Sequence, residues 1–154
     1  MGQLEPGDTA PSFTLRTHLN EDWSLERALA RGPVVLFFYP KDDTPVCIAE
    51  ACAFRDRHQV FSDRGAQVVG ISSDDVASHK SFASRHDLPY TLLSDPEAEV
   101  RDLFGVKRTL GFLEGRVTFV IDRDGRIAHV HSAALDAESH VVEALNALDA
   151  LGRA

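Results

Sequence analysis

Apolar and polar residues are arranged so that short strands alternate with helices along most of the chain. Two continuous apolar runs, at 34–39 and 66–72, are typical of strands that are covered on both faces. Further strands are predicted at 13–16, 90–93, 116–121 and 127–130. The turn residues 122–125 predict a hairpin between the last two of these strands.

Apolar residues at helical spacing predict helices between the strands. The helices are expected at 23–29, from Pro45 to about Arg64, from Val76 to about Asp87, from 94–97 to Gly105, and from Glu138 to about Leu151. The residues expected to face inward on the last helix are Val141, Val142, Leu145 and Leu148. Strands that alternate with helices indicate βαβ units, so we expect an α/β fold whose central mixed sheet has helices on both faces.

The composition is that of a globular protein. The chain has 154 residues, of which 44% are hydrophobic and 26% are charged, which is enough for one core. No repeat or linker interrupts it, so we expect one domain over residues 1–154. The formal charge of −8, without a basic cluster, argues against nucleic-acid binding. No apolar run approaches the ~20 residues of a membrane helix and no secretory signal is recognisable, so a cytoplasmic protein without a membrane span is expected.

The chain has two cysteines, Cys47 and Cys52, which are too few for a disulfide-stabilised scaffold. A zinc site would need histidines, but no metal-ligand spacing is found among five of the seven: His79, His86, His129, His131 and His140. No Gly-rich phosphate loop follows a strand either. We therefore expect no metal, flavin, haem or nucleotide, and the cysteines serve either redox chemistry or core packing.

Cys47 lies between a predicted strand and a predicted helix, where functional groups gather in α/β sheets. With Thr44 as the N-cap, Cys47 occupies the helical position that holds Glu in a capping box. The free backbone amides and the helix dipole therefore favour a thiolate there. The Thr44 hydroxyl is expected within reach of the Cys47 N–H. The alternative is that Cys47 only fills the start of the helix. Fast thiol chemistry also requires groups that stabilise the charge developing on a substrate.

Residues 39–56 closely resemble the active-site segment of the peroxiredoxins. They are most similar to the branch called peroxiredoxin Q, or bacterioferritin comigratory protein. The specific pattern is P-x-x-x-T-x-x-C, which runs from Pro40 to Cys47, together with Arg116 two residues before Thr-Phe. Further similar segments are 2–13, 70–74, 88–96 and 116–122. The resemblance extends over nearly the whole chain.

The resemblance implies a thioredoxin-like fold and the reduction of hydrogen peroxide and organic hydroperoxides. Cys47 matches the peroxidatic cysteine, and Cys52 matches the resolving cysteine of this branch. Thr44 matches the residue whose hydroxyl binds peroxide and thiolate, and Pro40 matches the proline that shields the site from water. Arg116 matches the arginine that fixes thiolate and substrate. The implied reductant is thioredoxin or a similar dithiol, and a monomer or weak homodimer is expected.

Some residues leave alternatives open. Val46 and Ile48 replace the usual residues on either side of Cys47 and are expected to make the entrance more apolar. Glu50 is interpreted as a partner for an arginine, against the alternative of a solvated helix face. The alternative interpretation of Arg116 is an exposed charge on a strand. The alternative interpretation of Thr44 is a residue that only caps the helix.

The spacing of the cysteines constrains the cycle. Residues five apart on an intact helix have Cα atoms roughly 8.7 Å apart. A disulfide needs Cα atoms within about 6.8 Å. We therefore hypothesise that the turns from Cys47 to Cys52 unwind during each turnover. Alternative functions are a thioredoxin-like dithiol–disulfide oxidoreductase, for which C-x-x-x-x-C is the wrong spacing, a non-enzymatic redox sensor, and a scaffold with incidental cysteines.

Overall fold

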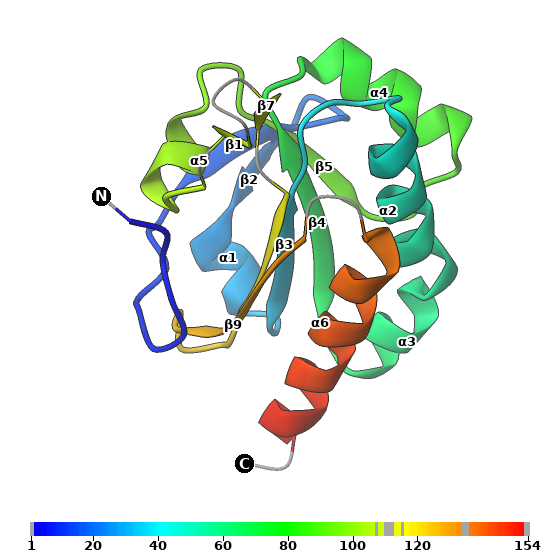
Figure 1. The fold of residues 1–154 in the computed structure, drawn as a ribbon. Helices are drawn as coiled ribbons and strands as arrows, with labels where there is room; N and C mark the ends of the chain where they lie inside the picture. The colour runs from blue at the N-terminus through cyan, green and yellow to red at the C-terminus, as the bar shows by residue number, and fades with distance from the viewer. Residues whose placement is uncertain (1, 107, 110–112, 115, 134–135, 153–154) are drawn as a thin grey trace.

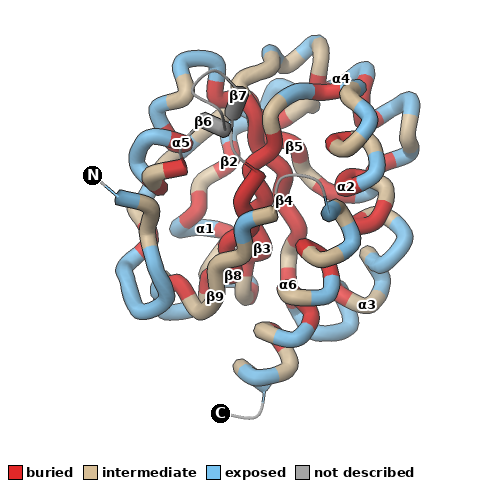
Figure 2. The backbone as a smooth tube through the Cα atoms, viewed as in Figure 1, coloured by how far each residue is buried: buried red, intermediate tan, exposed pale blue. Residues whose placement is uncertain are grey.

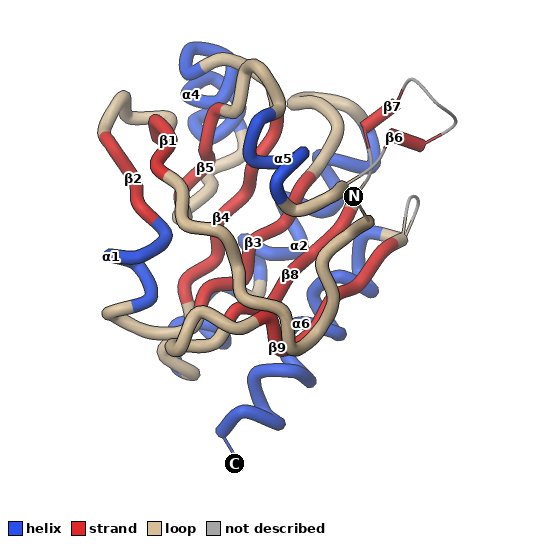
Figure 3. The backbone as a smooth tube through the Cα atoms, turned by 90° about the vertical axis from the view of Figure 1, so that its left-hand side faces the viewer, coloured by secondary structure: helices blue, strands red, loops and turns tan. Residues whose placement is uncertain are grey.

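A seven-stranded mixed sheet separates two layers of helices in the computed structural model of the chain (Figure 1). The structure describes residues 2–106, 108–109, 113–114, 116–133 and 136–152. The sheet strands are β1 (Thr14–Thr17), β2 (Asp22–Ser24), β3 (Val34–Phe38), β4 (Gln67–Ser72), β5 (Thr91–Ser94), β8 (Val117–Ile121) and β9 (Ile127–Ser132). Their order is β2-β1-β5-β4-β3-β8-β9, as can be followed in Figure 3. A separate short pair consists of β6 (Arg108–Thr109) and β7 (Leu113–Glu114).

The helices lie on both faces of this sheet, as predicted. They are α1 (Leu25–Leu29), α2 (Pro45–Asp56), α3 (His58–Asp63), α4 (Val76–Arg85), α5 (Glu99–Leu103) and α6 (Ala137–Gly152). Helices α2, α3, α4 and α6 cover one face, and α1 and α5 cover the other (Figure 1). The α/β class and the mixed sheet are therefore confirmed. No helix in the described ranges is long and apolar enough to cross a membrane.

The central strands are apolar throughout because both of their faces are covered. On β3, Val35 and Phe37 pack with the residues of α2 and α6, while Leu36 and Phe38 pack on the opposite side. This division follows from the two-residue period of a strand. Figure 2 shows the resulting buried centre of the sheet. The parallel pairs β3–β4 and β4–β5 place the ends of these strands at one edge, from which the chain enters α2 and α4.

Two predicted helices begin later than expected. Residues 22–24 form the edge strand β2, where Trp23 pairs with Leu15, and only then does α1 begin. Strand β5 continues through Ser94, and α5 begins at Glu99 rather than at 94–97. Pairing with β1 outweighs the helical signal at 22–24. At 95–98 the chain forms a turn that ends in the left-handed Ala98 (φ 57°), and α5 begins only after it.

Two details of the predicted helices are also wrong. The helix expected from Pro45 to about Arg64 is divided at Arg57, whose backbone (φ −106°, ψ 9°) ends α2 and precedes α3. Val142 is 45% exposed instead of facing inward, because the buried stripe of α6 consists of His140, Val141, Ala144, Leu145 and Leu148. The predicted hairpin turn is confirmed, since the Asp122 carboxylate accepts hydrogen bonds from the backbone of Asp124 and Arg126.

Candidate active site

Cys47 lies in the first turn of α2, directly beyond the end of β3. Pro45 begins the helix, as its fixed φ and missing N–H favour, and Cys47 follows as the third helical residue. The side chain is only 1% exposed and belongs to the core cluster between the sheet and α2. The positive end of the helix dipole lies at this N-terminus and attracts negative charge.

Arg116 reaches Cys47 from the neighbouring strand. Val117 pairs with Phe38 in the antiparallel β3–β8 ladder, so Arg116 enters the sheet beside the residue that leads into the active-site loop. Its Nη2 donates to Sγ of Cys47 at 3.2 Å, and its Nη1 donates to Oε1 of Glu50 at 2.8 Å. Burial alone would lower the pKa of Arg116, but the neighbouring Glu50 and Cys47 raise it overall. A permanent positive charge therefore lies beside the sulfur, and the alternative of an exposed strand charge is wrong.

Glu50 is the carboxylate on the other side of this guanidinium. It is fully buried, so the predicted arginine partner is confirmed and the solvated helix face is wrong. Burial raises the pKa of Glu50 to about 7, although Arg116 acts in the opposite direction. Among the described residues, Oε2 of Glu50 has no hydrogen-bond partner.

Thr44 is the N-cap of α2, as predicted, but its hydroxyl does not cap the helix. No side-chain hydrogen bond joins it to the first turn, so the expected contact with the Cys47 N–H is wrong. The hydroxyl instead donates to the Lys41 carbonyl at 2.9 Å. The loop turns at Asp43, where φ is 61°, and this turn brings the Lys41 carbonyl within reach. The Thr44 hydroxyl thus donates its hydrogen bond to the loop, and its oxygen accepts no hydrogen bond from the backbone of α2.

Pro40 and Cys52 lie at the two ends of the segment that contains Cys47. Pro40 is partly exposed and begins the loop after β3. Cys52 is partly buried on the same regular helix as Cys47, and both thiols are free. With α2 intact, the two residues keep the helical Cα separation of roughly 8.7 Å that prevents a disulfide.

A buried polar network beneath the loop was missed by sequence reasoning. The Asp42 carboxylate accepts from the Tyr39 hydroxyl at 2.6 Å and lies 2.7 Å from Nδ1 of His79. Nε2 of His79 faces the Leu93 carbonyl at 2.8 Å, so both ring nitrogens have polar partners. Burial alone would raise the pKa of Asp42, but His79 and the neighbouring hydroxyls lower it overall. The only sequence signal is the position of Tyr39 and Asp42 on either side of Pro40.

The network anchors the active-site loop to the next strand as well. The backbone N–H of Asp42 donates to Oδ2 of Asp74 at 2.7 Å, and the Ser72 hydroxyl donates to the same oxygen at 2.8 Å. Asp42, Asp74 and His79 are close enough to hold a cation, but these hydrogen bonds already occupy their polar atoms. We therefore interpret the cluster as the support of the loop.

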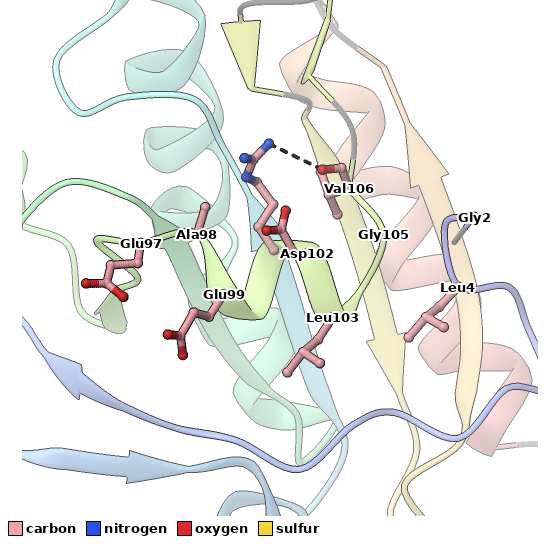
Figure 4. A pocket seen from close by; sticks show the side chains of 10 residues that line it. Gly2, Leu4, Glu97, Ala98, Glu99, Asp102, Leu103, Gly105 and Val106 are labelled. Carbon is pink, nitrogen blue, oxygen red and sulfur yellow. Dashed lines mark hydrogen bonds between the residues drawn. The ribbon is translucent and has the colours of Figure 1, made fainter.

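A surface groove of about 830 Å³ lies on the opposite side of the sheet (Figure 4). Glu97, Glu99 and Leu103 line it from the α5 region, and Gly2 and Leu4 line it from the N-terminal segment. The buried Arg101 donates to the Val106 carbonyl at its edge. None of the predicted site residues lines this groove, so it is separate from the thiol.

Comparisons with known proteins relate the whole arrangement to one family. A model described as the AhpC/TSA family matches residues 6–130. The chain is 44% identical over 151 residues to "Peroxiredoxin Q, chloroplastic" of Oryza sativa subsp. japonica. The aligned region covers 97% of this chain and 69% of that protein. The crystal structure of peroxidoxin BcpB from Mycobacterium tuberculosis has a TM-score of 0.91 and 41% identity, with 97% and 99% of the two chains covered. The Xanthomonas campestris bacterioferritin comigratory protein, studied for alkyl peroxide reduction, has a TM-score of 0.83 and 27% identity, with 97% of each chain covered.

Proposed function

The chain belongs to the AhpC/TSA family and is a thiol peroxidase of the peroxiredoxin type, and we propose that Cys47 is the thiol that reduces the peroxide. Its sheet and helices have the thioredoxin-like fold that the sequence resemblance implies. The observation that carries the proposal is the hydrogen bond from Arg116 to Sγ of Cys47. A cation and a helix N-terminus that converge on one sulfur favour its thiolate form, which is the nucleophile.

In the first step, the Cys47 thiolate attacks one oxygen of the peroxide. A sulfur–oxygen bond forms, the oxygen–oxygen bond breaks, and the sulfur is oxidised to a sulfenic acid. The leaving oxygen takes up a proton and departs as water or as an alcohol. Arg116 stabilises the negative charge as it moves from sulfur to oxygen.

Thr44 and Pro40 have supporting roles in this proposal. Because the Thr44 hydroxyl donates its hydrogen bond to the backbone carbonyl of Lys41, its oxygen is oriented to accept a hydrogen bond from the peroxide O–H. Pro40 limits the access of water to the loop. Val46 and Ile48 give the entrance an apolar character that suits organic hydroperoxides as well as hydrogen peroxide.

In the second step, the Cys52 thiol condenses with the sulfenic acid. The products are a Cys47–Cys52 disulfide and water, so atoms and electrons balance. The step requires α2 to unwind over its first turns, because the intact helix keeps the cysteines apart. Thioredoxin or a similar dithiol then reduces the disulfide by thiol–disulfide exchange. The monomeric or weakly dimeric state and the cytoplasmic location stay predictions.

Steady-state turnover tests this function. Peroxide consumption is coupled to thioredoxin and its reductase for the wild type, Cys47→Ser and Cys52→Ser. We expect full loss with Cys47→Ser, and with Cys52→Ser loss of thioredoxin-dependent cycling but not of one stoichiometric reduction. Turnover by Cys47→Ser at the wild-type rate would contradict the proposal.

A further inference from the structure

Glu50 lies in the part of α2 that has to change shape. The residue is between Cys47 and Cys52, so the unwinding proposed above would move it with the helix backbone. In the wound helix its side chain is fully buried. The unwound segment exposes the carboxyl group to water, and the two forms of α2 therefore differ in the environment of one acid.

In the wound helix, two other elements lie against the carboxyl group. Arg116, at the start of β8, donates to Oε1 at 2.8 Å. His140, on α6, places Nδ1 3.5 Å from Oε2, but this nitrogen is already paired with the Thr118 hydroxyl at 2.8 Å. Nε2 of His140 lies 2.9 Å from the Ala133 carbonyl and therefore carries the ring proton.

This arrangement suits a neutral Glu50 better than an ionised one. With the ring proton on Nε2 and the Nδ1 lone pair used by the Thr118 hydroxyl, His140 has no hydrogen to donate to Oε2. A carboxylate oxygen there is a buried negative charge without a donor among the described residues. Protonation of the carboxyl group removes that charge, whose burial is unfavourable.

Three other titratable groups around Glu50 keep one charge state near neutral pH. Burial lowers the pKa of His140 to about 4, so its ring is neutral. Burial and the charge of Glu50 raise the pKa of Tyr90 well above its usual range, so its hydroxyl is neutral too. Arg116 stays positive. Arg116 bonds both Cys47 and Glu50, so the experiment below also replaces the thiol.

We propose that Glu50 is a proton-operated latch on α2: the neutral carboxyl group keeps the helix wound, and its ionisation favours the unwinding that brings Cys52 to Cys47. The latch rests on the proposed function, because it controls the second step of that cycle. At a pH where Glu50 is protonated, the Cys47 sulfenic acid has a longer lifetime before it condenses with the Cys52 thiol. Further peroxide then oxidises it to the sulfinic acid more often, with release of water or alcohol.

The direction of the pH effect follows from linkage. Glu50 has a pKa of about 7 in the wound helix and an ordinary value of 4.5 in water. The wound form therefore binds the proton more tightly, and its extra stability is lost as the pH rises through 7. With these two values, the equilibrium constant for unwinding rises about tenfold between pH 6 and pH 8.

Hydrogen exchange of the α2 amides tests the latch without peroxide. Cys47→Ser removes the titration of the thiol, and the matched protein Cys47→Ser/Glu50→Gln removes that of the acid as well. After correction for intrinsic exchange, we expect α2 opening in the first protein to rise about tenfold from pH 6 to pH 8. We expect less than about a twofold change in the second protein, and none in α4 of either. Equal pH dependence in both proteins would overturn the latch.

A second measurement does not depend on a variant. In wild-type protein labelled with ¹³C-glutamate, the Glu50 carboxyl signal is expected to titrate near pH 7 in the reduced form. In the disulfide form it is expected to titrate in the ordinary range. An ordinary midpoint in both forms would overturn the latch while leaving the peroxidase function intact, because turnover tests that function separately.

Discussion

Nη2 of Arg116 lies 3.2 Å from Sγ of Cys47, although 69 residues separate the two in the sequence. The contact results from the β3–β8 ladder, which places the start of β8 beside the loop that leads into α2. A guanidinium in this place is already oriented before the peroxide binds. Such preorganised charge is the contribution that an enzyme site adds to a reactive thiol.

Replacing Arg116 by Gln is expected to lower the rate constant of Cys47 with peroxide by about 10²–10³-fold, the usual cost of a lost charge-stabilising donor. The rate is measured by stopped flow with reduced protein. Arg116→Lys keeps the charge but cannot bridge Cys47 and Glu50 in the same geometry, so an intermediate rate is expected. An unchanged rate in Arg116→Gln would exclude a role of this side chain in the reaction.

The same substitution separates activity from stability. Without Arg116, Glu50 loses the charge that lowers its pKa, so the buried acid must take up a proton or stay unpaired, which costs up to about 3–5 kcal/mol of unfolding free energy where the wild-type acid is ionised. Urea denaturation is expected to show this loss at pH 8 and a smaller one at pH 6, where Glu50 is protonated. Arg116→Gln/Glu50→Gln should recover stability but not activity. Recovery of both would mean that the arginine only neutralises Glu50.

Thr44→Val is expected to slow the reaction with peroxide by about 10²-fold, because the oxygen that accepts from the peroxide is removed. The unfolding free energy should change by less than about 1 kcal/mol, since the hydroxyl makes no capping bond to α2. Thr44→Ser is the matched control and should retain most of the rate. A loss of stability without a loss of rate would assign Thr44 to capping alone.

His140 is expected to make the protein sensitive to acid. Its pKa is about 4 in the folded protein against an ordinary 6.5, so the unfolded chain binds the proton more tightly. The contribution of His140 to stability is present above pH 6.5 and is lost as the pH falls towards 4, by about 3 kcal/mol. His140→Gln should flatten this part of the curve of unfolding free energy against pH. An unchanged pH dependence in His140→Gln would exclude His140 as its source.

Asp42→Asn is expected to destabilise the protein by about 3–5 kcal/mol, because it breaks the buried pair with His79. The neighbouring Asp43→Asn affects more exposed contacts with Arg85 and His86 and should cost less than about 1 kcal/mol. Urea denaturation at pH 7 compares the two. Equal effects would mean that the network does not hold the loop.

The sequence predicts those parts of the protein that depend on local pattern. The runs at 34–39 and 66–72 form buried strands because helices cover the sheet on both faces. Cys47 lies in the first turn of a helix because Pro45 favours the first helical position. Strand β2 was missed because its three residues are fixed by pairing with β1 and not by their own pattern.

Contacts between distant segments could not be read from residue types. The pair of Asp42 and His79 depends on how α4 packs beside the loop, and the position of His140 next to Glu50 depends on α6. The direction of the Thr44 hydroxyl depends on a single left-handed residue, Asp43. The placement of Arg116 was available only from the family resemblance.

Single-turnover oxidation of the Cys52→Ser protein tests the central claim most directly. One equivalent of hydrogen peroxide is mixed with the reduced protein, and trapped samples are analysed by peptide mass spectrometry. We predict that one oxygen is added to Cys47 at a rate several orders of magnitude above that of free cysteine at the same pH. Oxidation no faster than that of free cysteine, or addition of the oxygen to another residue, would contradict the account.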